Sequence, residues 1–251
     1  MPPPSAERTH PSRAAVVLPA RNEAGAIGAV VRGALEAGAT PYVVDNGSTD
    51  GTADVARAAG AVVTSEQQPG YGIACRRGMD AAMAAGFDVI GFMDADGSDP
   101  PEEIPRLLAA LDRCDGVLGV RRRSTEGWQA MPPAQKLGNW LVPAALRVLL
   151  NANYTDMPSC KFFRREALAS LDPRDETYGF TIELLVRAHA LGLRIEEIPI
   201  AYRSRTAGES KVSGNLRASV QAGLRILSVV ARHAWRAREA ERGQRAASRR
   251  R

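Results

Sequence analysis

The chain has 251 residues and an apolar content of 45%, which is enough to bury the core of one large domain. Its cysteines, Cys75, Cys114 and Cys160, lie far apart without a CxxC pair, which argues against a disulfide framework or a cysteine-based zinc site and fits a reducing cytoplasm. The first 13 residues lack the apolar centre of a signal peptide, and no apolar run approaches the roughly 18 residues that span a bilayer. We therefore expect a cytoplasmic protein that is soluble or lies on a membrane surface.

Positive charge is concentrated at the C-terminus. The formal net charge is +5 at pH 7, and much of the excess lies in residues 232–251. The arginines of this tail are Arg232, Arg236, Arg238, Arg242, Arg245, Arg249, Arg250 and Arg251. Such a tail can contact anionic lipid or nucleic acid, or it can be a solvated end. It lacks the interleaved aromatic residues that favour single-stranded nucleic acid, so we expect no nucleic-acid partner.

The first half of the chain alternates short β-branched runs with Ala-rich segments. Residues 1–13 are Pro-rich and are expected to be disordered. The runs AAVVLPA, YVVD, AVVTS, VIGFMD and GVLGV are predicted strands. The predicted helices between them are Ala26–Glu36, Thr52–Ala59, Ile73–Ala85 and Glu102–Leu111. This alternation predicts an α/β protein with a mainly parallel sheet and helices on both faces.

Each predicted strand ends in polar residues. The segments are PARNE from Pro19, DNGSTD from Asp45, EQQPGYG from Glu66, DAD from Asp94 and RRR from Arg121. The carboxyl ends of parallel strands share one edge of the sheet, where α/β proteins bind ligands. Five successive predicted strands that end in polar residues therefore predict a ligand-binding site at that edge.

The second half of the chain is less regular. A predicted helix at 138–150 carries an apolar face formed by Trp140, Leu141, Ala144, Ala145, Val148 and Leu149. Residues 194–202 are predicted to form a strand. A second stripe, in a predicted C-terminal amphipathic helix, comprises Leu216, Val220, Leu224, Leu227, Ala231 and Trp235. Such stripes either pack on the core or lie on a membrane.

The acidic segment FMDADGSDPPEE follows the fourth predicted strand. Asp94 and Asp96 alternate in an extended segment, so both carboxylates can approach one hard divalent cation such as Mg²⁺. An EF-hand loop counted from Asp94 would need Gly and Glu where Asp99 and Pro105 stand, which excludes a calcium loop of that kind.

Two other types of binding site have sequence motifs similar to segments of this chain. A dinucleotide site would need a third glycine after Gly70 and Gly72, where Cys75 stands, and would follow the first strand. We exclude it. DADGS also matches the nucleophile motif of haloacid-dehalogenase-like phosphatases, although three strand and loop units precede it here. That class of enzyme remains an alternative.

Taken in order, LPARNE, VVDNGSTDGT, PGYG, FMDADGSDPPEE, GVRRR and RTAGESKVSG resemble the family 2 glycosyltransferases. The resemblance covers about residues 14–230 and is greatest to the branch of dolichyl-phosphate mannosyltransferase and bacterial polyprenyl-phosphate sugar synthases. It implies a single Rossmann-like GT-A domain at 14–231, ahead of the basic tail at 232–251. Within that domain, residues 14–123 would form the nucleotide-sugar-binding half and residues 124–231 the acceptor half.

The resemblance also implies roles for individual residues. The nucleotide-sugar-binding set is Pro19, Arg21, Glu23, Asp45, Asp94, Ala95, Asp96 and Arg121. An Mg²⁺ or Mn²⁺ ion would be held by Asp94, Asp96 and Ser98. The acceptor-phosphate set is Ser159, Arg205, Ser210 and Lys211, and the catalytic set is Asp96, Arg121, Arg205 and Lys211. The cation would neutralise charge growing on the leaving diphosphate, while the basic residues bind phosphate oxygens.

The acceptor decides whether a general base is needed. A sugar hydroxyl must lose a proton during attack, whereas a polyprenyl phosphate is already anionic at neutral pH. The resemblance implies an inverting transfer of a hexose from a UDP- or GDP-sugar to polyprenyl or dolichyl phosphate. The alternative acceptor within the family is a saccharide or small-molecule hydroxyl, for which Asp156 and Glu183 are the candidate bases. We expect His189 to be a half-buried helix residue.

Two departures from the family pattern bear on the ligands. Asn46 stands where relatives carry a second aspartate, and Cys160 and Lys161 follow Ser159 where relatives carry Gly-Phe, which leaves the acceptor open. A lipid acceptor would place the enzyme peripherally at the inner face of the membrane. The apolar face at 140–150 and the basic C-terminal helix would then dock on anionic lipid. A nucleotide-sugar-binding module without turnover is the non-enzymatic alternative.

Overall fold

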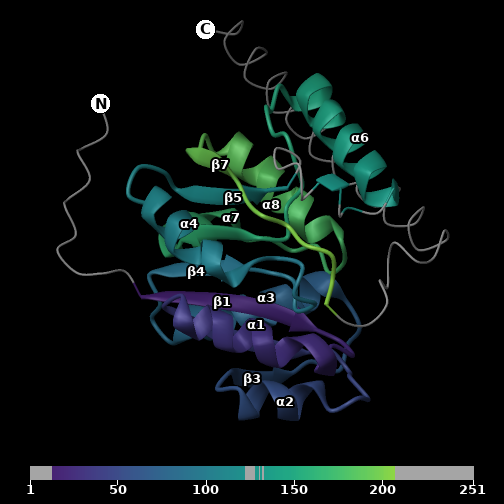
Figure 1. Ribbon diagram of the computed structural model, residues 1–251. Coiled ribbons are helices and arrows are strands. Elements are labelled where there is room, and N and C mark those ends of the chain that lie inside the picture. Colours follow the sequence, from purple (N-terminus) through teal and green to yellow (C-terminus); the bar gives the residue numbers. More distant parts are fainter. Residues whose placement is uncertain (1–12, 122–127, 130, 132, 207–251) are drawn as a thin grey trace, which may run out of the picture.

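A seven-stranded sheet forms the centre of the structure (Figure 1). The computed structural model describes residues 13–121, 128–129, 131 and 133–206. The strands are β1 (Ala14–Ala20), β2 (Ala39–Asp45), β3 (Val62–Ser65), β4 (Val89–Phe92), β5 (Gly116–Val120), β6 (Lys161–Arg164) and β7 (Ile195–Pro199). They lie in the order β3-β2-β1-β4-β6-β5-β7, and only β6 pairs antiparallel to its neighbours within the described chain. The predicted mainly parallel sheet is confirmed.

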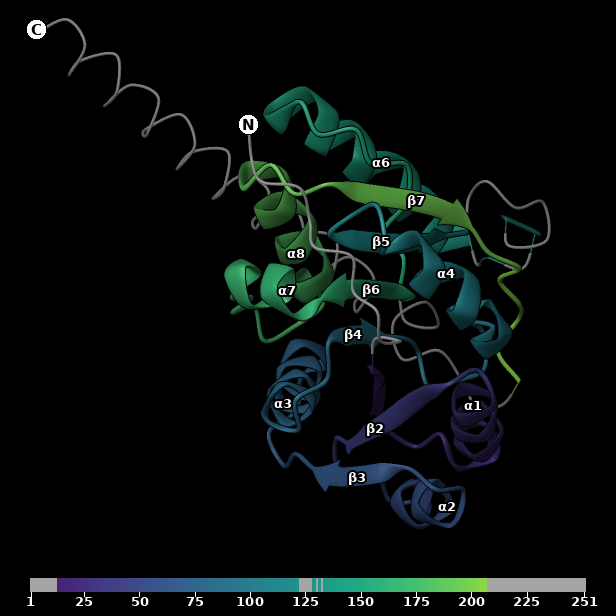
Figure 2. The same ribbon diagram turned by 90° about the vertical axis from the view of Figure 1, so that its left-hand side faces the viewer.

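Helices cover both faces of this sheet (Figure 2). One face carries α1 (Ala24–Glu36), α2 (Thr52–Ala58) and α4 (Ile104–Ala110), which follows the 3₁₀ turn η1 (Pro101–Glu103). The other face carries α3 (Tyr71–Ala84), α6 (Pro133–Leu150), α7 (Arg165–Leu171) and α8 (Gly179–Ala190). Strands covered on both faces are expected to be continuously apolar, and β4 and β5 are buried at every residue.

The reversed strand β6 fits between β4 and β5 because two glycines make room for its aromatic side chains. Gly91 of β4 pairs with Phe162, and Gly116 of β5 pairs with Phe163. A Cβ on either glycine would overlap the facing phenylalanine ring. Because β6 is antiparallel, its first residue lies at the edge where β4 and β5 end. Lys161 therefore pairs with Phe92, next to the acidic segment.

The predicted elements of the first half match the structure to within a few residues. The predicted strand at 194–202 is shorter, as β7, while β6, α7 and α8 complete the second half. The predicted disordered segment is described only at Arg13, and the predicted C-terminal helix and basic tail lie outside the described residues. Among the residues described, no helix has both the length and the apolarity needed to cross a bilayer.

Candidate active site

The loops after β1 and β2 are joined to each other. Asn22 N donates to Ser48 Oγ at 2.9 Å, and Asn22 Oδ1 accepts from Thr49 N at 2.8 Å. Asp50 Oδ2 accepts from Ala24 N, the first residue of α1, at 3.0 Å. These contacts fix the segments of the predicted nucleotide-binding residues against each other. Of those residues, Pro19 is half-buried in β1 one residue before its end, Arg21 is exposed, and Asp45 Oδ1 accepts from Ser48 N at 3.2 Å.

Asn46 holds the loop that follows β3. Its Nδ2 donates to Glu66 O at 3.0 Å and to Gln68 O at 2.8 Å, while its Oδ1 accepts from Gly70 N at 2.9 Å. An aspartate cannot donate to those two carbonyls. The departure from the family pattern at Asn46 thus has a local structural role, which could not be read from the sequence because its partners lie some twenty residues further along the chain.

Arg205 closes over the acidic segment. Its Nη2 lies 2.7 Å from Asp96 Oδ2, and its Nη1 lies 3.4 Å from Glu23 Oε1. Thr206 N donates to Asp96 O at 3.1 Å, so the backbone is tied down at the same place. Asp96 Oδ1 is held by Ser98, whose N and Oγ donate to it at 2.9 and 2.6 Å. The fold therefore brings Glu23, Asp96, Ser98 and Arg205 together at the predicted edge.

The acidic segment holds more negative charge than its described neighbours neutralise. Burial and the neighbouring carboxylates of Asp99 and Asp96 raise the pKa of Asp94 to about 7. Asp99 is fully buried, and its Oδ1 makes no hydrogen bond of normal geometry with any described residue. A divalent cation with partial protein coordination suits such a place, because Mg²⁺ fills its other positions with water and phosphate. Within the described ranges, no three acidic, His or Cys side chains form a complete metal cage.

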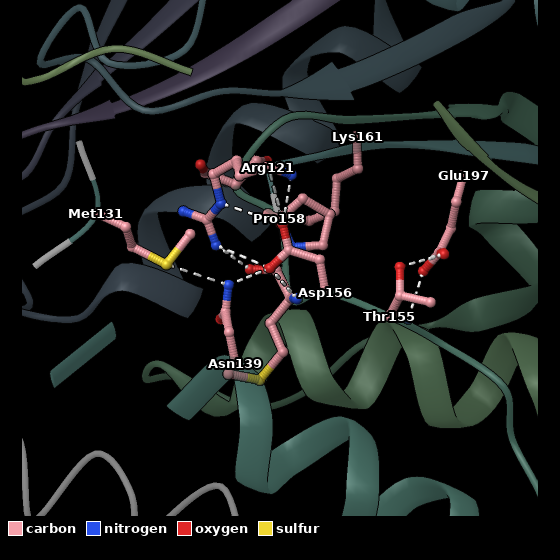
Figure 3. Close-up of polar contacts among 10 residues, drawn as sticks. Arg121, Met131, Asn139, Thr155, Asp156, Pro158, Lys161 and Glu197 are labelled. Atoms are coloured by element: carbon pink, nitrogen blue, oxygen red, sulfur yellow. Dashed lines mark hydrogen bonds and ion pairs between the residues drawn. The ribbon is translucent and has the colours of Figure 1, made fainter. Parts of the chain in front are cut away.

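Arg121 lies in a buried network with Asp156 (Figure 3). Asp156 Oδ2 accepts from Arg121 N at 2.7 Å and from Arg121 Nε at 3.3 Å. Asp156 Oδ1 accepts from Met157 N at 2.7 Å and from Nδ2 of Asn139 on α6. Arg121 Nη2 also donates to Met157 O at 2.6 Å, and its guanidinium carbon lies 5.1 Å from the centre of the Tyr202 ring. Arg121 is thus at the end of β5 as predicted, but most of its bonds orient it within the protein.

Lys161 holds the same loop from the other side. Its side chain is fully buried, and Nζ donates to Pro158 O at 3.1 Å, Ser159 O at 3.0 Å and Thr181 Oγ1 at 3.2 Å. Burial lowers the pKa of this amine from its ordinary value. The sequence marked Lys161 only as a departure from the family. A lysine in the apolar run CKFF was the one available signal that its charge is satisfied internally.

The two candidate bases are both engaged. Asp156 is fully buried in the network with Arg121 and Asn139. Glu183 Oε2 accepts from Arg174 N at 2.7 Å and from Asp175 N at 2.6 Å. His189 is exposed rather than half-buried, and its Nε2 lies 2.8 Å from Leu150 O.

The remaining predicted site residues are placed as follows. Ala95 is buried between the two aspartates of the DAD segment, and Ser159 is buried in the loop that Lys161 holds. Ser210 and Lys211 lie outside the described residues.

A mainly parallel sheet of this order with polar residues at the carboxyl ends of its strands is compatible with a nucleotide-sugar transferase of the GT-A type, and comparison with known proteins identifies the family. A family model described as "Glycosyl transferase family 2" matches residues 15–172. The chain belongs to this family and is a glycosyltransferase. Membership also removes the phosphatase alternative, whose acidic motif would follow the first strand rather than β4.

The chain is also similar to individual relatives and to solved structures. An uncharacterised glycosyltransferase of Mycobacterium tuberculosis is 40% identical over 86% of this chain and 96% of its own length. The undecaprenyl-phosphate mannosyltransferase of Micrococcus luteus is 35% identical, over 69% of this chain and 76% of its own length. The crystal structure of glucosyl-3-phosphoglycerate synthase from Mycobacterium tuberculosis matches with a TM-score of 0.70 and 27% identity, covering 88% of this chain and 80% of the other.

The role of Asn46 can be tested by restoring the family's second acid. Asn46→Asp replaces two donated hydrogen bonds with a carboxylate that faces two carbonyl oxygens, so we expect the free energy of unfolding to fall by about 1–3 kcal/mol. Chemical denaturation measures this change. Asn153→Asp, which adds the same charge at an exposed asparagine, is the matched control and should be neutral. Equal stability of the two variants would contradict the role assigned to Asn46.

Proposed function

We propose that the chain is an inverting, metal-dependent glycosyltransferase that moves a hexose from a UDP- or GDP-sugar to a polyprenyl phosphate at the cytoplasmic face of the membrane. Its similarity to an undecaprenyl-phosphate mannosyltransferase supports this acceptor class. The observation that carries the proposal is the state of Asp156, which accepts hydrogen bonds from Arg121, Asn139 and Met157. A carboxylate engaged in this way is poorly suited to take a proton from a hydroxyl, whereas a phosphate acceptor requires none.

On the donor side, the joined loops after β1 and β2 would bind the nucleoside through Pro19, Arg21, Glu23 and Asp45. Asp94, Asp96 and Ser98 are the residues that would hold an Mg²⁺ or Mn²⁺ ion beside the diphosphate, and Ala95 belongs to the proposed nucleotide-sugar-binding set. When bound, such an ion neutralises charge on the leaving group. The buried carboxylate of Asp99 close to Asp94 and the raised pKa of Asp94 support a cation at this place.

On the acceptor side, the basic residues would bind the attacking phosphate. Arg205 lies at this edge, where it forms ion pairs with Asp96 and Glu23. When a diphosphate and its cation bind, the cation can take over the carboxylates and the phosphate can take over Arg205. Ser159, Ser210 and Lys211 complete the set that we propose for the acceptor, while Arg121 belongs to the proposed catalytic and nucleotide-sugar-binding sets. Attack from the face opposite the leaving diphosphate inverts the anomeric carbon.

An exposed apolar face on α6 supports membrane docking. Trp140 and Val148 have exposed fractions of 57% and 80%, and they share this face with Leu137, Leu141 and Leu149. The prediction from sequence left open whether this stripe packs on the core; in the structure it is exposed. Tryptophan and aliphatic side chains on one helical face suit the boundary between headgroups and acyl chains. The same helix carries Asn139, which contacts Asp156 in the loop at residues 151–160 that precedes β6, here called the acceptor loop.

A second candidate acceptor follows from a structural neighbour. The matched glucosyl-3-phosphoglycerate synthase was solved with phosphoglyceric acid. A small phosphorylated hydroxy acid would use the same basic residues but would also require removal of a hydroxyl proton. The two candidates can therefore be told apart by offering each acceptor separately to the purified protein.

Donor and acceptor can be identified together. Labelled UDP-glucose, GDP-mannose and UDP-N-acetylglucosamine are each incubated with a short polyprenyl phosphate or with 3-phosphoglycerate. We expect one donor to give an organic-extractable product that requires Mg²⁺ or Mn²⁺. Product formed only with 3-phosphoglycerate would establish the second candidate, and no lipid product with any donor would overturn the lipid-acceptor proposal.

The acid of the cation site is tested in the same assay. Asp96→Asn should lower turnover at least about a hundredfold, because both the cation contact and the partner of Arg205 are weakened. Asp54→Asn, on the exposed surface of α2, removes one aspartate elsewhere and should change nothing. Full turnover by Asp96→Asn would remove Asp96 from the mechanism.

Cation binding should depend on pH through Asp94. Its pKa of about 7 means that a proton competes with the cation below neutrality. We therefore expect Mn²⁺ affinity to rise about tenfold between pH 6 and pH 8 and then to level off, because the carboxylate is by then fully ionised. Electron paramagnetic resonance of free Mn²⁺ measures the affinity. The Asp54→Asn control should show the same profile, and an affinity independent of pH over this range would contradict the role of Asp94.

A further inference from the structure

Helix α6 has two faces with different surroundings. Its outer face carries the exposed Trp140 and Val148, whereas Asn139, next to Trp140 in sequence, is 2% exposed. The Nδ2 of Asn139 donates to Asp156 Oδ1 and lies 3.6 Å from Met131 Sδ. A helix with an apolar outer surface therefore has a direct polar contact to the centre of the acceptor loop.

Asp156 passes this contact to Arg121 (Figure 3). Asp156 Oδ1 accepts from Asn139 on α6, from Met157 N and, at 3.5 Å, from Arg121 Nη2, while Oδ2 accepts from Arg121 N and Nε. The carboxylate is fully buried, so no solvent is available to replace a lost donor. Loss of the Asn139 bond would leave Asp156 Oδ1 with Met157 N at 2.7 Å and the long contact to Arg121 Nη2 at 3.5 Å, so the carboxylate that orients Arg121 would lose its donor from α6.

Arg121 has little freedom to absorb such a rotation by itself. Its guanidinium is planar, and its bonds to Asp156 and Met157 O fix that plane while the Tyr202 ring lies 5.1 Å away. Lys161 holds the carbonyls of Pro158 and Ser159, which limits movement of the loop as a whole. Asp156 is thus the group that contacts both Asn139 on α6 and the guanidinium of Arg121.

We propose that Asn139 is a positioning residue that sets the orientation of Arg121 through Asp156, and so links the position of α6 to the acceptor site. This inference rests on the proposed function for the roles of Arg121 and of the apolar face. It adds that a lipid surface in contact with α6 influences the phosphate-binding edge, because one amide joins the two. Asn139 itself touches no substrate.

Asn139→Leu tests the link, since leucine keeps the size and removes the donor. With a short water-soluble polyprenyl phosphate we expect kcat to fall roughly tenfold to a hundredfold, the scale of a misplaced catalytic group. Asn153→Leu makes the same change at an exposed asparagine and should leave kcat unchanged. A loss seen only with vesicle-embedded acceptor would show that α6 acts in docking alone and would overturn the proposal.

A double-mutant cycle shows whether the effect passes through Arg121. In an Arg121→Lys background, Asn139→Leu should cost no more than about twofold, because the group that it positions is already altered. The same loss in both backgrounds would overturn the proposal. Asn139→Ala serves as the second variant if the leucine variant does not fold.

A spectroscopic readout separates this proposal from the proposed function. The Arg121 Nε–Hε signal in ¹H–¹⁵N spectra, assigned by its absence in Arg121→Lys, should shift or broaden in the Asn139 variant and stay unchanged in Asn153→Leu. If the wild type makes no lipid-linked product, the proposed function fails, but the signal still tests the link. An unchanged Arg121 signal in the Asn139 variant would contradict it.

Discussion

The ion pairs from Arg205 to Asp96 and Glu23 unite the charged edge of the sheet. They join the last described segment of the chain to the loop after β4 and to the start of α1. Two further carboxylates lie in the same segment, the half-buried Asp94 and the buried Asp99, and desolvation raises the pKa of both. This edge of the sheet combines several carboxylates with an arginine. It is therefore suited to a ligand that contains phosphate and binds together with a cation. This balance of charge underlies the proposed donor site.

Much of the donor half could be predicted because its information is local. Apolar runs and helical spacing indicate β1 to β5 with the helices between them, and parallel strands place their carboxyl ends at one edge by geometry alone. Asp94, Asp96 and Glu23 were therefore identifiable as neighbours before any coordinates. The resemblance added Arg205, whose approach to Asp96 from 109 residues away follows from no local pattern.

The acceptor half was less predictable because its arrangement depends on distant partners. The reversed strand β6 requires Gly91 and Gly116 to face two phenylalanines, and this reversal alone places Lys161 at the site. Asp156 looked like a candidate base, yet three segments converge to saturate it. Arg121 looked like a phosphate ligand, and most of its donors turn out to hold the acceptor loop. The sequence contains each of these residues but not their pairings.

In the proposed donor site, the acidic segment and a divalent cation together hold the diphosphate of the donor. Calorimetric titration of UDP and of GDP into the full chain, with and without Mn²⁺, tests this claim most directly. We expect Mn²⁺ to strengthen binding of one nucleotide by about tenfold or more, and Asp96→Asn to abolish this gain while the metal-free affinity is retained. Equal affinity with and without Mn²⁺ in the wild type, or a full gain in Asp96→Asn, would contradict it.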